Sequence, residues 1–218
     1  MKLKELLEMA PYHAKGENPP EHWKKSLDIS ISKSALERDY SFLSSLDINP
    51  AIDDAEILHF YMLNEGRTIH GGYFIIDEIG EERLKIVFVL TFKANNTLKA
   101  YPKDINKKLL LQVSKVNTNS QFGRIGIASF VYQSLIQKGF IILSDTVQLD
   151  GGKALWQKMS KYSQIKDYKI RIIDDETGYL KRNGKILEYD GSNISDDEIW
   201  TTEMNFDGEH TLLIMSLK

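Results

Sequence analysis

The sequence predicts a mixed α/β fold, with a central sheet of roughly six to eight strands and helices on both faces. Residues 84–93 (LKIVFVLTFK) contain five consecutive apolar positions, 86–90, which is typical of a central strand that is covered on both sides. Residues 109–173 follow the pattern strand, helix, strand, helix, strand, which indicates a parallel strand pair joined by a crossover helix. Residues 1–50 are mostly helical in pattern. We therefore expect an N-terminal helical extension over 1–50 that packs on a core formed by 51–218.

Composition narrows the function classes. Hydrophobic residues make up 42% of the 218 residues and charged residues 27%, as in an ordinary globular domain. The net charge of −3 comes from 28 basic and 31 acidic residues that are interspersed, which argues against a nucleic-acid partner. The absence of cysteine excludes disulfides, a thiol nucleophile and a cysteine metal site. The charged start of the chain is unlike a signal peptide, and no apolar run approaches the roughly 20 residues of a membrane span. We expect a cytoplasmic protein with no membrane partner.

The N-terminal half predicts two helices followed by strands. A short helix is expected at 3–9, before a loop that Pro19-Pro20 forces to be extended. A second helix is expected within 33–46, capped by Ser32 or Ser34. The aromatic and β-branched runs 56–63 and 68–77 then predict a hairpin, which leads into the strand at 84–93.

The C-terminal half alternates strands and helices before it ends in short strands. Gly139 is placed to end the crossover helix, because glycine readily adopts the left-handed conformation that follows a helix. Asn183-Gly184 predicts the turn of a late hairpin. The expected elements are a strand at 108–116, a loop at 117–121, a helix at 125–138, a strand at 140–144, a helix at 154–162, and strands at 169–173 and 211–217.

The segment 113–128 carries the most specific signal, because a strand runs through a polar loop into a helix. The first N–H groups of a helix lack internal partners and lie at the positive end of its dipole, so they suit a pyrophosphate. The segment resembles the Arg/Gln-x-x-Gly-x-Gly/Ala signature of the GNAT N-acyltransferases, except that Arg124 stands where the first glycine is usual. The resemblance implies that acetyl-CoA (coenzyme A) binds here. It assigns the cofactor to Gln121, Phe122, Gly123, Arg124, Ile125, Gly126 and Ile127.

The resemblance continues into residues 151–159, where Ala154, Leu155 and Met159 fit the family's later helix. Trp156 replaces a tyrosine that often protonates the departing CoA thiolate. Asp145 follows a buried strand, at the edge where α/β sheets bind ligands, and is a candidate for acid–base work. Tyr132, within the crossover helix, is a second candidate. A loop carboxylate and a core tyrosine are the plainer interpretations of these two residues.

Other polar clusters in the sequence fit structural roles better than functional ones. His59 and His70 lie on adjacent predicted strands and could bind a metal or act as a base, but a half-exposed sheet face explains them better. Gly71-Gly72 and Gly151-Gly152 could hold a phosphate, although paired glycines more often mark bulges or turns. The acidic runs 174–176 and 196–198 could hold a hard cation, but they lack a regular alternation of oxygen ligands, which favours solvated turns or helix starts. We expect no bound metal.

The leading functional hypothesis is therefore transfer of an acetyl group from acetyl-CoA to an amine acceptor, which is a small molecule or a protein. A second hypothesis, favoured by Arg124 and Trp156, is a GNAT-shaped binding or inhibitory protein without catalysis. The composition of the sequence, which is rich in lysine, asparagine and isoleucine and free of cysteine, also resembles that of phage-encoded GNAT-like proteins. This similarity adds a third hypothesis, a nucleobase-modifying enzyme, which the lack of a basic excess disfavours. The sequence leaves open a homodimer.

Overall fold

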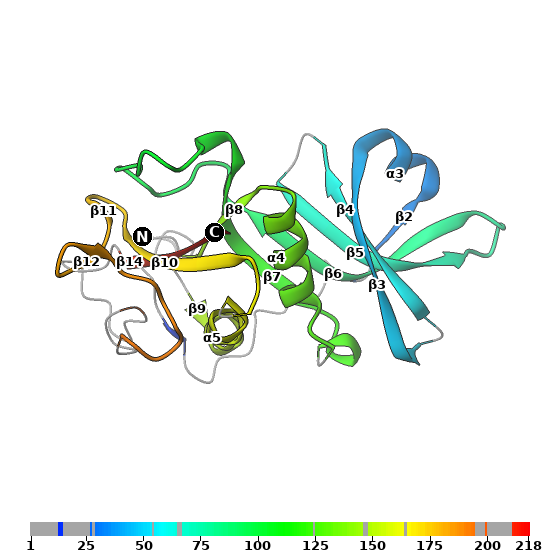
Figure 1. The fold of residues 1–218 in the computed structure, drawn as a ribbon. Helices are drawn as coiled ribbons and strands as arrows, with labels where there is room; N and C mark the ends of the chain where they lie inside the picture. The colour runs from blue at the N-terminus through cyan, green and yellow to red at the C-terminus, as the bar shows by residue number, and fades with distance from the viewer. Residues whose placement is uncertain are drawn as a thin grey trace. The chain divides into compact units, whose positions relative to one another are not determined.

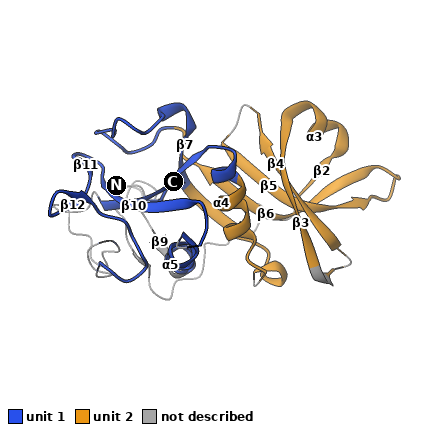
Figure 2. Cartoon of the chain, viewed as in Figure 1, with its two compact units in different colours: residues 1–17, 95–113, 135–218 blue, residues 18–94, 114–134 orange. Residues whose placement is uncertain are grey.

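A computed structural model describes residues 13–14, 27, 29–53, 55–64, 67–123, 125–145, 148–163, 165–194, 199 and 211–218 (Figure 1). Within these residues the fold is mixed α/β, with a ten-stranded, mostly antiparallel sheet and three α-helices. The chain divides into two compact units (Figure 2). Unit 1 comprises 1–17, 95–113 and 135–218, and unit 2 comprises 18–94 and 114–134.

Unit 2 is built on antiparallel strands. Their order is β3-β4-β5-β6, and β2 pairs with β6. The predicted hairpin and the strand after it are confirmed as β4, β5 and β6. Residues 86–90 of β6 are all buried, as expected for a strand that is covered on both faces. The bounds are β2 Ser30–Ser32, α3 Lys33–Asp39, β3 Tyr40–Ile52, β4 Ala55–Leu63, β5 Thr68–Ile76 and β6 Glu82–Phe92.

Helices cover both faces of this part of the sheet, as the sequence predicts. Leu36 of α3 packs against a buried cluster on β6, and Tyr61 of β4 packs against the same cluster. On the other face, the ring of Phe130 in α4 (Ile127–Gln137) lies 5.7 Å from that of Phe60. Phe60 and Tyr61 are consecutive in β4 and therefore point to opposite faces, so α3 and α4 cover different sides.

The helix predicted within 33–46 is confirmed as α3, which fills the first half of that range. Ser32 caps α3, and its Oγ accepts a hydrogen bond from the Ala35 N–H at 3.3 Å. The helix stops at Asp39, and Tyr40 opens β3, where it pairs with Leu63 of β4. Residues 40–46 form strand and not helix, because pairing with β4 outweighs a weak local helical pattern. The expected boundary at residue 50 falls inside β3, and the helix expected at 3–9 and the Pro19-Pro20 loop lie outside the described residues.

Gly71 and Gly72 lie opposite a β-bulge, in which Val87 of β6 is the extra residue between their partners Phe88 and Ile86, in agreement with the structural interpretation of this pair. The register between β5 and β6 shifts between the two glycines. A Cβ atom on Gly72 would lie 1.9 Å from the carbonyl oxygen of Lys85, so the backbone of β6 excludes any side chain there. Glycine at this position is required by the close approach of two strands.

Unit 1 contains the predicted parallel pair. The first residues of β7 (Leu110–Thr118) pair in parallel with β8 (Ile141–Leu143), and α4 connects the two strands. Gly139 has a φ of +85° and follows α4, as predicted. The last strand, β14 (Thr211–Leu217), lies between β8 and β10 (Tyr168–Asp174) and is antiparallel to both. β7 and α4 contribute residues to both units.

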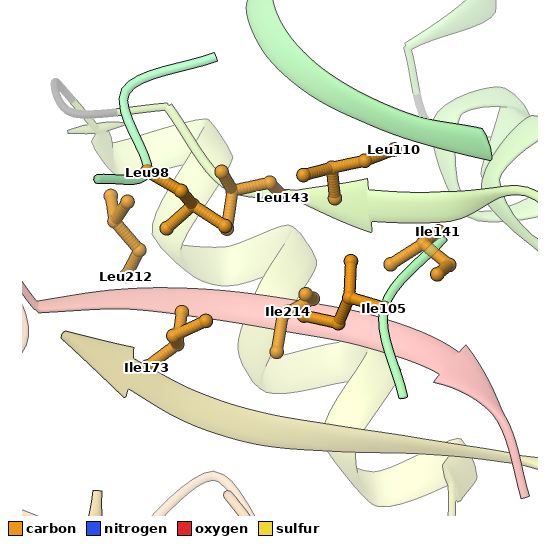
Figure 3. Packing of buried hydrophobic residues seen from close by; sticks show 8 residues of the cluster. All are labelled: Leu98, Ile105, Leu110, Ile141, Leu143, Ile173, Leu212 and Ile214. Atoms are coloured by element: carbon orange, nitrogen blue, oxygen red, sulfur yellow. The ribbon is translucent and has the colours of Figure 1, made fainter. Parts of the chain in front are cut away.

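The remaining elements of unit 1 are short. α5 (Asp150–Ser163) begins earlier than predicted, and the hairpin at Asn183-Gly184 is confirmed. A buried apolar cluster lies on β8, β10 and β14. Leu98 and Ile105, from the segment between β6 and β7, pack onto it (Figure 3). The other bounds are β1 His13–Ala14, η2 Lys107–Leu109, β9 Gln148–Leu149, β11 Gly178–Tyr179, β12 Lys181–Arg182 and β13 Lys185–Ile186.

Candidate functional site

The connection from β7 to α4 is more ordered than the expected loop. β7 continues to Thr118, and a single turn of 3₁₀-helix, η3 (Ser120–Phe122), follows. Asn119 caps this turn, since its Oδ1 accepts a hydrogen bond from the Gln121 N–H at 3.1 Å. The Asn119 N–H itself donates to the carbonyl of Val87 at 2.8 Å, which ties the turn to β6. The start of α4 is thereby fixed to the sheet within unit 2.

Three of the N–H groups expected to face the cofactor are already engaged within this turn. Phe122 donates to the Asn119 carbonyl at 2.9 Å, Gly123 to Ser120 at 3.3 Å, and Ile125 to Phe122 at 3.4 Å. A pyrophosphate would have to displace these bonds or use other donors. The described donors that remain as candidates are those of Gly126 and Ile127, at the start of α4, where a helix supplies no internal acceptor.

Gly126 is fixed by its backbone. Its φ is +80°, a conformation that residues with a Cβ seldom adopt, and its carbonyl accepts the Phe130 N–H at 3.1 Å to begin α4. The glycine therefore sets the angle at which the chain enters the helix. Whether or not a ligand binds here, a larger residue at 126 would strain this entry.

The side chains of the segment divide into anchors and an exposed group. Phe122 is 0% exposed, and its ring centroid lies 6.1 Å from that of Tyr73. Ile127 is also buried, whereas Gln121 is exposed and free to reach a ligand in solvent. Arg124 lies outside the described residues. Of the seven residues assigned to the cofactor, Gln121 is thus the described one whose polar side chain faces solvent.

Asp145, in unit 1, is half-buried and follows β8 through a rigid attachment. The Ser144 N–H donates to the Leu213 carbonyl at 2.8 Å, and the Ser144 Oγ accepts the Leu213 N–H at 3.1 Å. The Ser144 carbonyl accepts from Nε2 of Gln112 at 3.3 Å. Ser144 is therefore hydrogen-bonded to both neighbouring strands, β7 and β14. These bonds would fix the position of the backbone from which the Asp145 carboxylate extends.

Tyr132 and Trp156 are both core residues, each 1% exposed. Burial of Tyr132 in unit 2 favours the plainer interpretation of this residue as core rather than proton donor. Trp156 in α5, in unit 1, is among the largest fully buried side chains. Neither side chain offers a polar atom to an open cleft.

His59 and His70 are separated by the strand register. His59 pairs with Gly72, and His70 pairs with Tyr61, so the two imidazoles are not direct cross-strand partners. The His59 ring packs 5.2 Å from Phe74, and the His70 ring packs 5.7 Å from Tyr40. Burial lowers the pKa of both imidazoles, which favours their neutral form.

No group of three or more candidate metal-ligating side chains occurs within the described part of the chain. Asp174 acts as a turn cap, because its Oδ1 accepts the N–H groups of Glu176 at 3.0 Å and Thr177 at 2.7 Å. Gly151-Gly152 lies in the first turn of α5, and the acidic run 196–198 lies outside the described residues.

A polar cluster that sequence reasoning missed lies beside Phe122. The Tyr73 hydroxyl donates to Oδ2 of Asp53, and Nζ of Lys85 lies 3.0 Å from the same oxygen and 5.3 Å from the centre of the Tyr73 ring. Burial, reinforced by the bond to Asp53, raises the pKa of Tyr73. The bonds from Tyr73 and Lys85 lower the pKa of Asp53. The three residues are far apart in sequence, and only the strand pairing brings them together.

Comparison of the chain with models of known protein families, with curated proteins and with solved structures found no match. In the described residues, none of the helices combines the length and the apolar character needed to cross a bilayer.

Proposed function

We propose that the chain is an acyl-CoA-dependent N-acyltransferase that transfers an acetyl group to an amine acceptor. The observation that carries the proposal is the succession β7, η3, α4 and β8, in which a parallel strand pair is joined by a crossover helix. This is the architecture that the GNAT-like sequence signature at 121–126 implies. The polar turn, Gly126 with its positive φ and the start of α4 follow one another along the chain, and this order supports the proposal.

The residues would divide the work as follows. The N–H groups of Gly126 and Ile127 and the positive end of α4 would hold the pyrophosphate, with the Gln121 amide and the Arg124 guanidinium as additional donors. When bound, acetyl-CoA supplies the thioester carbonyl that the acceptor amine attacks, and the CoA thiolate leaves. The step that removes the amine proton is assigned to Asp145, in unit 1, on the sequence pattern alone. Holding the amine beside the thioester supplies the entropic part of the catalysis.

Calorimetric titration with acetyl-CoA tests this proposal. The wild-type chain should bind, and Arg124→Ala should weaken binding by about 1–3 kcal/mol, the range for loss of a charge-assisted hydrogen bond. Arg182→Ala is the matched control, because Arg182 is an exposed arginine of the β12–β13 hairpin. Tighter binding by Arg124→Gly would instead show that the side chain obstructs the site. If millimolar acetyl-CoA produces no heat and no thermal shift, cofactor binding at this segment is refuted.

A binding or inhibitory protein without catalysis is the second candidate, and specific observations favour it. The N–H groups of Phe122, Gly123 and Ile125 are satisfied within the turn, and both Tyr132 and Trp156 are buried. The two candidates differ in one measurement, the release of free thiol from acetyl-CoA in the presence of a panel of amines. Thiol release with any amine supports the enzyme. Binding of acetyl-CoA without release supports the inactive protein.

A further inference from the structure

One face of the sheet in unit 1 changes from apolar to charged along its length. Strand register places Ile173 beside Leu212, Arg171 beside Ile214, and Lys169 beside Ser216, and these alternate positions share a face. Leu98 and Ile105 pack onto the apolar end of this face (Figure 3). Beyond these residues the same face carries Arg171 and Lys169 in place of isoleucine and leucine.

A cavity of about 370 Å³ lies at this level, entirely within unit 1. Its apolar lining comes from Leu109, Phe140 and Ile141, and its polar lining includes Lys169, Arg171 and Asp104. The volume falls at the lower end of the range of small-molecule sites, about 300–1,000 Å³. The combination of an apolar wall with a few convergent charges is typical of such sites.

Arg171 is held in a fixed orientation at the wall of the cavity. Its Nη1 donates to Oδ2 of Asp104 at 2.8 Å and to the Tyr179 hydroxyl at 2.9 Å, and its guanidinium lies 4.9 Å from the centre of the Tyr179 ring. The side chain is only 13% exposed. A guanidinium carries five N–H donors, so these bonds orient the group without exhausting it.

Lys169 adds a second cation that is not neutralised by Asp104. It lies two residues before Arg171 on the same face of β10, and within the described residues its Nζ makes neither a hydrogen bond nor an ion pair. Lys218 also lines the cavity. Three cations therefore meet one described side-chain carboxylate, and the local charge favours an anion.

We propose that this cavity binds a small organic anion, in which a carboxylate or phosphate group is attached to an apolar body. The anionic group would lie against Lys169 and Arg171, because arginine pairs well with the planar, paired oxygens of both groups. The apolar body would lie against Leu109, Phe140 and Ile141. The site shares no residue with the segment proposed to bind acetyl-CoA.

The test is a titration of the ¹⁵N-labelled full-length protein with phenyl phosphate, followed by amide chemical shifts. Saturable shifts should centre on Gly139, Phe140, Ile141 and Lys169. Lys169→Glu and Lys169→Gln should each weaken binding by about tenfold or more, as expected for loss of a charge-assisted contact. Lys185→Glu on β13 makes the same change in net charge at an exposed position outside the cavity and should bind as the wild type does. The spectra of the variants report directly whether they fold.

Further ligands separate the contributions. Inorganic phosphate should bind more weakly than phenyl phosphate, and benzyl alcohol, which has no charge, should not bind. Benzoate in place of phenyl phosphate shows which anionic group the site prefers, and saturable binding of either supports the proposal. The proposal is overturned if neither anion gives saturable shifts at the cavity. It is also overturned if Lys185→Glu weakens binding as much as Lys169→Glu, or if inorganic phosphate binds as tightly as phenyl phosphate.

Discussion

Gln112 shows how much a single buried amide can organise. It is 0% exposed in the apolar strand β7, and its Oε1 accepts the Thr97 N–H at 2.7 Å. Its Nε2 donates to the Thr97 hydroxyl at 3.0 Å and to the Ser144 carbonyl at 3.3 Å. One side chain thus joins β7, the segment after β6 and the residue that precedes Asp145.

We expect Gln112→Leu to lower the free energy of unfolding by about 1–3 kcal/mol, because the substitution leaves the half-buried Thr97 N–H and the buried Ser144 carbonyl without these partners. Urea denaturation measures the change. Gln137→Ala, at an exposed position in the last turn of α4, is the matched control and should change stability by less than about 0.5 kcal/mol. Equal stability of Gln112→Leu and the wild type would show that the bonds add nothing net.

At the scale of elements, the β5–β6 bulge depends on the absence of a side chain. A Cβ atom at Gly72 would meet the backbone of Lys85 and Ile86, which cannot move aside as a flexible side chain can. Gly72→Ala should therefore destabilise the protein by about 1–3 kcal/mol or more, the cost of forcing atoms into a packed interior. Gly151→Ala in α5 is the control, since a Cβ atom there meets nothing within 4 Å. A melting temperature for Gly72→Ala that equals that of the wild type would contradict the tight approach of the two strands.

The β4–β5 pair makes stability depend on pH through His70. Burial lowers the pKa of His70, and its Nδ1 has no hydrogen-bond partner within the described residues. The unfolded chain, where histidine titrates near its ordinary pKa of about 6.5, binds the proton more readily than the folded chain. The stabilisation is therefore complete above about pH 6.5 and is lost as the pH falls below that value.

We expect the free energy of unfolding to decline between pH 7 and pH 5, and to decline less in His70→Phe. The comparison requires urea denaturation of both proteins at several pH values. Burial also lowers the pKa of His59, but His59 is present in both proteins. The difference between the two curves therefore gives the contribution of His70 alone. Parallel curves would show that His70 titrates alike in the folded and unfolded states.

The hydrophobic periodicity of the sequence and its turn residues predicted most of the helices and strands, but they predicted little of the candidate site. The strands at 56–63, 68–77, 84–93 and 211–217 and the turn at Asn183-Gly184 follow from local signals that pairing reinforces. Residues 40–46 form strand and not helix, because they pair with β4. At the site, the 3₁₀ turn is set by the Asn119 cap and its bond to Val87. That bond joins residues distant in sequence, as do those of the Asp53, Tyr73 and Lys85 cluster, and neither is readable from a local pattern.

At the scale of the whole molecule, neither unit is a continuous stretch of chain. The chain passes from one unit to the other after residues 17, 94, 113 and 134. The passage after 113 lies inside β7, and the passage after 134 lies inside α4. Hydrogen bonding within a helix is cooperative, because each bond relies on the order of its neighbours. We infer that the two units unfold together.

Amide hydrogen exchange of the Gly72→Ala variant tests this inference. Gly72 belongs to unit 2, so the substitution acts there directly. If unfolding is shared, the amides of β10 and β14 in unit 1 should lose protection by the same free energy as those of β5 and β6. Unchanged protection of β10 and β14 would show that unit 1 keeps its structure when unit 2 opens.

The hairpin of β12 and β13 has a practical consequence. Asn183 and Gly184 both have positive φ, at 53° and 76°, so they form the tight reversal that suits a two-residue hairpin loop. Residues 181–186 are all exposed, and a Cβ atom on Gly184 meets nothing within 4 Å. Exposed loop tips of this kind tolerate inserted sequence. A short epitope or a fluorophore acceptor peptide placed between these two residues would therefore label the protein while leaving both chain ends unaltered.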